Sequence, residues 1–374
     1  MTRLFLHIGS PKAGSSAIQA SMQALSDASK IAAGLTVLPV NPYGRPFPSG
    51  FVAARYLPLD DLPRFLRFRY ERDPDQFQQD LETHWGLIRD ALLKPCRAVR
   101  SGWRMPWQPA PSPSPTGAAL LSSEYLWRLP LEQVRRLRAD FEALGVDEFR
   151  IIAYVREPVS AYASYLQQWL RLTTDLELYN PETWHYQPRN RLETWQTVFG
   201  DSLVVRPFVR EQLQGRSVVC DYLAHLSDWV QTPVQGAEVK AVNESLSTEE
   251  LFLLQEILRA IPPEQTRQPQ WPFRMSRFRR LMSEAAKPLE CQPVRLQSWV
   301  AHLVWERHQL DLAWLQERYG LTFPPPVGHA GDEVAPATHP SGFRLEQLLC
   351  PPSDHQRCGE LMRQSLAMIL AEGI

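Results

Sequence analysis

The sequence predicts an α/β fold in which a parallel sheet is flanked by helices. Short apolar runs, long enough for buried strands, alternate along the chain with segments whose apolar residues recur at helical spacing. The predicted strands cover residues 4–8, 118–123, 150–155 and 202–206. Strands that alternate with helices favour a parallel sheet, because each crossover places a helix against one of its faces.

The helices are predicted from spacing and from their end signals. Ser15 is a plausible N-cap for a helix that carries Ile18, Met22 and Leu25 on one face. Pro158 suits the first turn of a helix that follows the third strand and runs to about residue 172. Residues 247–250 have the form of a capping box before the apolar run 251–261. Further helices are predicted at 77–93, at 131–144 and before Gly200.

The proline content divides the chain into core and inserted segments. Residues 41–117 carry many of the 33 prolines, and 109–115 alternate with proline as a stiff, extended linker does. We therefore predict one α/β domain over residues 1–325 with an insertion at about 41–117. Residues 326–374 are predicted to form a C-terminal helical extension packed on the same domain.

Charge and cysteine content exclude several classes of partner. The 40 Lys and Arg residues balance 41 Asp and Glu residues, so no global basic field draws the chain to nucleic acid or to an anionic membrane. The five cysteines are scattered without metal-ligand spacing. No run approaches the roughly 20 apolar residues that span a bilayer. We expect a cytoplasmic protein without a metal ion and without a membrane span.

The segment after the first predicted strand has the features of an anion-binding loop. Glycines let the backbone approach a phosphate closely, and the following helix start offers N–H donors and the positive end of its dipole. Lys12 adds a full charge, and two serine hydroxyls add further donors. The candidate binding residues are Gly9, Ser10, Pro11, Lys12, Ala13, Gly14, Ser15 and Ser16.

The position of the lysine separates this loop from an ATP-binding P-loop. In that motif the lysine directly follows the second glycine, whereas Lys12 precedes Gly14. Residues 7–16 instead resemble the 5′-phosphosulfate loop of sulfotransferases that use 3′-phosphoadenosine 5′-phosphosulfate (PAPS). Ala13 departs from the threonine that is common in that loop.

A second segment strengthens the resemblance. Residues 154–165 are similar to the 3′-phosphate segment of the same family, with Arg156 at a strand end and Ser164 eight residues later. An arginine can bind a phosphate with two parallel hydrogen bonds, and Ser160 and Ser164 lie on one helix face because they are four residues apart. PAPS carries the 3′-phosphate that such a second site requires. Residues 191–208, 243–247 and 314–320 resemble later parts of the family.

The resemblance implies a P-loop-like sulfotransferase fold, PAPS as co-substrate, PAP as product, and no metal. Sulfuryl transfer is an in-line displacement, and the resemblance implies that Lys12 stabilises the leaving oxygen. Glu124 is the candidate general base, because it follows the second predicted strand at the carboxyl edge of the sheet. A helix cap or an ion pair with Arg128 would explain Glu124 equally well. His7 is the other candidate base, with a satisfied core histidine as its alternative.

The acceptor is less defined than the co-substrate. We expect a hydroxyl or amine of a small molecule or a carbohydrate. Trp103, Trp107 and Trp127 could stack on a sugar or simply pack, and the basic run Arg267–Arg280 could hold an acidic acceptor, close over PAPS, or be a solvated helix face. The oligomeric state is left open. The alternatives to a sulfotransferase are a P-loop-like nucleotide kinase or NTPase and a non-catalytic nucleotide-binding protein.

Overall fold

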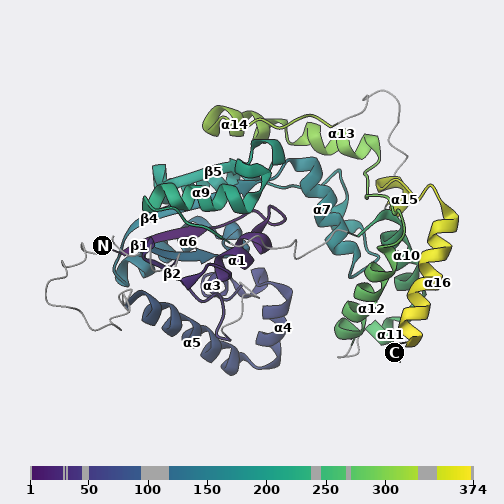
Figure 1. The fold of residues 1–374 in the computed structure, drawn as a ribbon, viewed down its shortest axis with the longest axis horizontal. Coiled ribbons are helices and arrows are strands. Elements are labelled where there is room, and N and C mark those ends of the chain that lie inside the picture. Colours follow the sequence, from purple (N-terminus) through teal and green to yellow (C-terminus); the bar gives the residue numbers. More distant parts are fainter. Residues whose placement is uncertain are drawn as a thin grey trace. The chain divides into compact units, whose positions relative to one another are not determined.

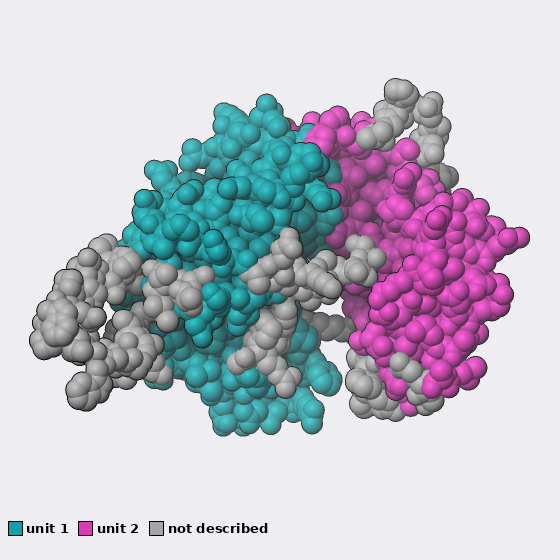
Figure 2. Space-filling view, viewed as in Figure 1, with its two compact units in different colours: residues 1–157, 187–243, 311–323 teal, residues 158–186, 244–310, 324–374 magenta. Residues whose placement is uncertain are grey.

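The structure is a computed structural model of the chain, and it divides into two compact units that interleave along the sequence. It describes residues 2–27, 30, 33–43, 50–93, 118–236, 246–266, 271–326 and 343–371. Unit 1 comprises residues 1–157, 187–243 and 311–323, and unit 2 comprises 158–186, 244–310 and 324–374 (Figure 2). This division differs from the predicted segments 1–325 and 326–374, because unit 2 takes up three separate stretches of the chain.

A five-stranded parallel sheet forms the centre of unit 1, which confirms the predicted fold class (Figure 1). Its strands are β1 (Thr2–His7), β2 (Leu35–Val37), β3 (Ala118–Ser122), β4 (Val146–Val155) and β5 (Leu203–Pro207). They are ordered β2-β3-β1-β4-β5, and every neighbouring pair is parallel. The order places the carboxyl ends of β3 and β4 on either side of the end of β1.

Helices cover the sheet. One hydrophobic cluster joins Ile152 and Tyr154 of β4 to α1 (Ser15–Gln23) and α9 (Val218–Val230). Because side chains alternate along a strand, Ile151 and Ala153 point to the opposite face. On β4 and β5 the sheet also contacts α8 (Pro188–Phe199), and β4 contacts α6 (Leu131–Ala143).

The inserted segment is helical where the structure describes it. It contains α3 (Phe51–Ala54), the 3₁₀ helix η1 (Leu59–Asp61), α4 (Arg64–Arg72) and α5 (Pro74–Leu93). The predicted linker 109–115 lies outside the described residues. The other 3₁₀ helices of unit 1 are η2 (Glu124–Arg128), η4 (Gly200–Ser202), η5 (Arg210–Gln212) and η6 (Gln214–Arg216), and most of α14 (Gln309–Tyr319) also belongs to unit 1.

Unit 2 is built from helices around its own core. It contains α7 (Pro158–Leu170), η3 (Glu177–Tyr179), α10 (Thr248–Ala260), α11 (Pro263–Thr266), α12 (Trp271–Ala286), α13 (Ser298–Arg307), α15 (Leu345–Leu348) and α16 (His355–Ala371). The predicted capping box is confirmed, since Ser247 Oγ accepts a hydrogen bond from Glu250 N and Glu250 Oε2 accepts one from Ser247 N. Among the described helices of both units, none has the length and apolar character needed to cross a membrane.

Candidate functional site

A tight turn connects β1 to α1 and places Lys12 at its tip. Ala13 N donates a hydrogen bond to Ser10 O at 3.2 Å, which closes a four-residue turn. Pro11 occupies its second position, and Lys12 has a φ of 66° at its third. These are the features of a type II turn, whose third position normally takes glycine. We call residues 9–14 the Lys12 turn; its backbone is strained at the residue with the candidate catalytic charge.

Two glycines are required by the packing of this turn. A Cβ atom at Gly9 would lie 2.5 Å from His7 Nε2 and 2.6 Å from Ser15 Oγ. Gly14 has a φ of 85°, and a Cβ atom there would lie 2.7 Å from Val218 Cγ1. Both sites therefore exclude a side chain, and the turn stays close to β1 and α9.

The start of α1 has the properties of an anion site. Gly14 holds the N-cap position, so the prediction of Ser15 as N-cap is wrong; Gly14 has no side chain with which to cap the helix, and the first turn contains no acidic residue. The Ser15 hydroxyl is buried, and among the described residues no hydrogen-bond partner reaches it. The first N–H groups of a helix lack helical partners, and the dipole is positive at this end. An anionic group would satisfy these donors.

Arg156 contacts the Lys12 turn directly. It follows β4, which lies next to β1 in the sheet. Its Nη1 atom donates a hydrogen bond to Lys12 O at 2.9 Å, and its guanidinium lies 5.6 Å from the ring centre of Phe208. The structure therefore brings together the two segments that the sequence singled out as anion sites.

A buried hydrogen-bond network braces the elements around this contact. The Tyr154 hydroxyl donates to Asp221 Oδ2 at 2.9 Å, and Arg206 Nη2 donates to Asp221 Oδ1 at 2.7 Å. Burial alone would raise the pKa of Asp221, but hydrogen bonds from Arg206, Gln214 N and Tyr154 hold it below its usual value. Tyr154 and Arg206 lie two residues before Arg156 and Phe208, so β4, β5 and α9 are held together beside the turn.

Glu124 lies within electrostatic reach of Lys12. It is the first residue of η2, directly after β3 and Ser123. Burial raises the pKa of the Glu124 carboxyl, and the positive charges of Lys12 and Arg128 offset part of that rise. A carboxyl group with a raised pKa within electrostatic reach of a lysine has the properties of a general base, so Glu124 stays the predicted candidate.

His7 is buried in the core of unit 1. Its Nδ1 is hydrogen-bonded to Ser122 Oγ at 2.7 Å, across the β1–β3 pair in which the two residues are in register. Burial lowers the pKa of His7 to about 3, so the ring is neutral at physiological pH. A ring with so low a pKa is a weak general base, and the geometry favours the alternative of a core histidine. Within the described residues its Nε2 has no hydrogen-bond partner.

The remaining predicted residues lie elsewhere. Ser160 and Ser164 lie on α7 of unit 2, half-buried and one helical turn apart, and their role at a 3′-phosphate stays a prediction. Trp127 is only 3% exposed, so it packs in the core and cannot stack on a sugar.

Trp103, Trp107 and Arg267 lie outside the described residues. The rest of the basic run lies on α12, where Arg279 Nη1 donates to Arg171 O at 2.9 Å.

Phe208 and Val218 are the neighbours of the turn that the sequence did not predict. Phe208 Cε2 would lie 3.0 Å from a Cβ atom at Gly14, and Val218 lies closer still. Residues 204–208 were recognised only as a family-like segment, and the apolar character of Phe208 gave no sign of a site. In the part of the chain that the structure describes, no group of three or more His, Cys, Asp or Glu side chains could hold a metal ion.

Comparisons with protein-family models, with curated proteins and with solved structures found no significant match to this chain.

Proposed function

We propose that the protein is a sulfotransferase that uses PAPS as sulfuryl donor and has a P-loop-like sulfotransferase fold. The observation that carries this proposal is the hydrogen bond between Arg156 Nη1 and Lys12 O. The sequence resemblance rests on two segments 144 residues apart, and their proximity at one edge of the sheet supports a site in which one nucleotide reaches both.

The residues of the Lys12 turn fit the 5′ end of such a nucleotide. The uncapped start of α1 and the buried Ser15 hydroxyl offer hydrogen-bond donors without an acidic residue in the first turn. The Arg156 guanidinium contacts the backbone of this turn, and Arg156, Ser160 and Ser164 remain the predicted contacts of the 3′-phosphate. When bound, PAPS would supply an activated sulfuryl group and a stable leaving group, PAP.

Two side chains have distinct roles in the proposed transfer. The Lys12 ammonium stabilises negative charge that develops on the oxygen from which the sulfuryl group departs. The Glu124 carboxylate accepts the proton of the acceptor hydroxyl as that oxygen bonds to sulfur. The raised pKa of Glu124 makes it a stronger base than an exposed carboxylate, and the Lys12 charge still favours its ionised form.

A ligand titration of the full chain tests the proposal. We expect PAP to stabilise the protein against heat without any metal, by about 2.7 kcal/mol at 100 times its dissociation constant. Arg156→Ala should weaken PAP binding, while Arg138→Ala, an exposed arginine of α6 paired with Glu142, should leave it unchanged. Equal or better stabilisation by ATP with Mg²⁺ would instead indicate a nucleotide kinase or NTPase.

Transfer itself needs a second measurement. The protein is incubated with PAPS labelled in the sulfuryl group and with phenols, amines and sugars as acceptors. Labelled product that disappears in Lys12→Ala supports the proposal. Tight PAP binding without sulfuryl transfer to any of the acceptors would indicate a non-catalytic nucleotide-binding protein.

A further inference from the structure

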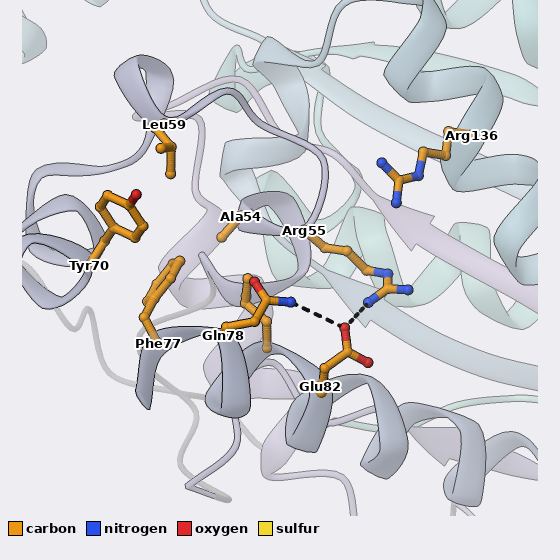
Figure 3. A pocket seen from close by; sticks show the side chains of 9 residues that line it. Ala54, Arg55, Leu59, Tyr70, Phe77, Gln78, Glu82 and Arg136 are labelled. Atoms are coloured by element: carbon orange, nitrogen blue, oxygen red, sulfur yellow. Dashed lines mark hydrogen bonds and ion pairs between the residues drawn. The ribbon is translucent and has the colours of Figure 1, made fainter. Parts of the chain in front are cut away.

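A cavity of about 300 Å³ lies in unit 1 between the inserted helices and α6 (Figure 3). Its lining residues come from the segment 54–82 and from one position of α6. None of them belongs to the Lys12 turn or its neighbours. The volume is at the lower end of the range for small-molecule sites.

One side of the cavity is apolar and aromatic. The rings of Tyr70 and Phe77 meet edge to face, with their centres 5.9 Å apart. Leu81 lies one helical turn after Phe77 on α5, and Leu59 is 48% exposed although it lines the cavity. Phe77 and Leu81 are already buried, so an aromatic ligand would remove water chiefly from Leu59, from Tyr70 and from its own ring.

Arg55 lies on the polar side of the cavity, where neighbouring side chains hold its guanidinium in place. Arg55 Nη1 donates to Glu82 Oε1 at 3.2 Å, and the Arg55 guanidinium lies 4.6 Å from the ring centre of Trp85. Its Nε also lies 3.6 Å from Asp140 Oδ2. The Arg55 charge is therefore already compensated by two carboxylates, and this part of the lining is held in place.

Arg136 differs from Arg55 because no acidic side chain of the described residues forms an ion pair with it. In Figure 3 its guanidinium lies across the cavity from the Tyr70 and Phe77 rings. It lies 5.9 Å from the ring centre of Tyr56, and among the described residues no carboxylate pairs with it. The cavity thus combines an aromatic wall with one positive charge that forms no ion pair within the described part of the chain.

We propose that this cavity binds a small aromatic compound that carries one negatively charged group. The ring lies against Tyr70, Phe77 and Leu81, and the anionic group accepts hydrogen bonds from Arg136. A carboxylate or a sulfate fits this position, because both accept two hydrogen bonds from a guanidinium fork. The proposal does not depend on sulfuryl transfer, since the cavity shares no residue with the Lys12 turn.

Two probes that differ only in charge test the proposal. The full chain is titrated with 3-phenylpropionate and with the neutral 3-phenylpropan-1-ol, and binding is measured by calorimetry or ligand-observed NMR. We expect the carboxylate to bind about tenfold more tightly, because a hydrogen bond to a charged group contributes about that factor. Raising the salt concentration should reduce the preference, since Arg136 is exposed.

Neighbouring arginines provide a matched pair of variants. Arg136→Gln should remove the preference for the carboxylate, while Arg135→Gln should keep it, because Arg135 is paired with Glu132 at 2.7 Å on the same helix. Gln78→Trp, at an exposed lining position, should fill the cavity and weaken both probes. Affinity of PAP should be unchanged in all three variants.

Three results would overturn the proposal: equal binding of the two probes, an equal effect of Arg135→Gln and Arg136→Gln, or no binding of 3-phenylpropionate at millimolar concentration. A loss of PAP affinity in Arg136→Gln would contradict the independence of the two sites. Because PAP binding is measured separately, failure of the cavity proposal leaves the proposed function unaffected, and the reverse also holds.

Discussion

The left-handed backbone of Lys12 gives a stability effect that can be separated from the function of its side chain. Lys12 has a φ of 66°, a conformation that costs an L-residue roughly 1–2 kcal/mol relative to glycine. We compare Lys12→Gly with Lys12→Ala. Both variants lack the ammonium group and its attraction to Glu124, so their difference in unfolding free energy reports only on the backbone.

The expected difference follows from two opposing effects. Glycine relieves the strain at Lys12, but it also has more conformational freedom in the unfolded chain, which costs about 0.4–1 kcal/mol. The net result is a Lys12→Gly variant that is more stable than Lys12→Ala by about 1 kcal/mol. For a unit of this size the melting temperature should differ by about 2–4 °C.

Denaturant and thermal unfolding measure stability, and PAP binding and sulfuryl transfer measure function. Both variants should lose sulfuryl transfer, although Lys12→Gly should be more stable than Lys12→Ala. Gln231, which follows α9 with a φ of 56°, provides the matched control. Gln231→Gly should be more stable than Gln231→Ala by a similar unfolding free energy, and neither variant should affect PAP binding. A Lys12→Gly variant no more stable than Lys12→Ala would refute the strain, and retained turnover would remove Lys12 from the mechanism.

Three further predictions concern the residues around the turn. The raised pKa of Glu124 means that folding favours its protonated form, so this contribution to stability is present at low pH and lost as pH rises through the raised pKa. Above that pKa, Glu124→Gln should be more stable than wild type, while its transfer rate should fall by about 10²–10⁴-fold. A transfer rate that does not rise with pH through this range would argue against Glu124 as the general base. The lowered pKa of His7, about 3, means that the free energy of unfolding falls as pH drops from 6.5 toward 3, by up to about 1.4 kcal/mol per pH unit. In denaturant titrations at several pH values, His7→Asn should reduce this fall. An unchanged dependence of the unfolding free energy on pH would show that His7 does not cause it. Gly9→Ala should lower the free energy of unfolding by about 1–3 kcal/mol and weaken PAP binding, because its Cβ would lie 2.5 Å from His7 Nε2. Gly86→Ala on α5 is the control: no atom lies within 4 Å of its Cβ position, so this variant should be as stable as wild type or more stable. Similar effects at the two glycines would contradict the steric reasoning.

The sheet was largely predictable because buried parallel strands are apolar along their whole length. Four of the five strands were predicted from such runs, and β2 was missed because three residues are too few to show a pattern. β4 begins at Val146, four residues before the predicted start at residue 150. The first residues of β4 were not predicted because the charged Asp147 and Glu148 interrupt the apolar pattern. In the folded chain Thr2 N donates a hydrogen bond to Asp147 and Trp229 Nε1 donates one to Glu148, and the sequence does not show these contacts.

The tight turn of the candidate site could be predicted from neighbouring residues, but the contacts between distant segments could not. Glycine, proline and lysine within a few residues indicate a tight turn before a helix, and the structure has that turn. The contact of Arg156 with Lys12 O depends on β4 lying next to β1, which no local pattern specifies. The low pKa of His7 likewise follows from its burial, which is a property of the assembled core.

The turn between β1 and α1 combines several energetic costs in one place. Lys12 has a strained backbone, the buried Ser15 hydroxyl has no described partner, and the helix start lacks a capping side chain. Folded proteins tolerate such costs where surrounding contacts fix the conformation, and here Arg156 and Phe208 do so. A ligand anion would satisfy the hydroxyl and the helix donors without moving the backbone. If the proposed anion binds here, the features that lower the stability of the free protein would favour its binding, because the hydrogen-bond donors would need no rearrangement.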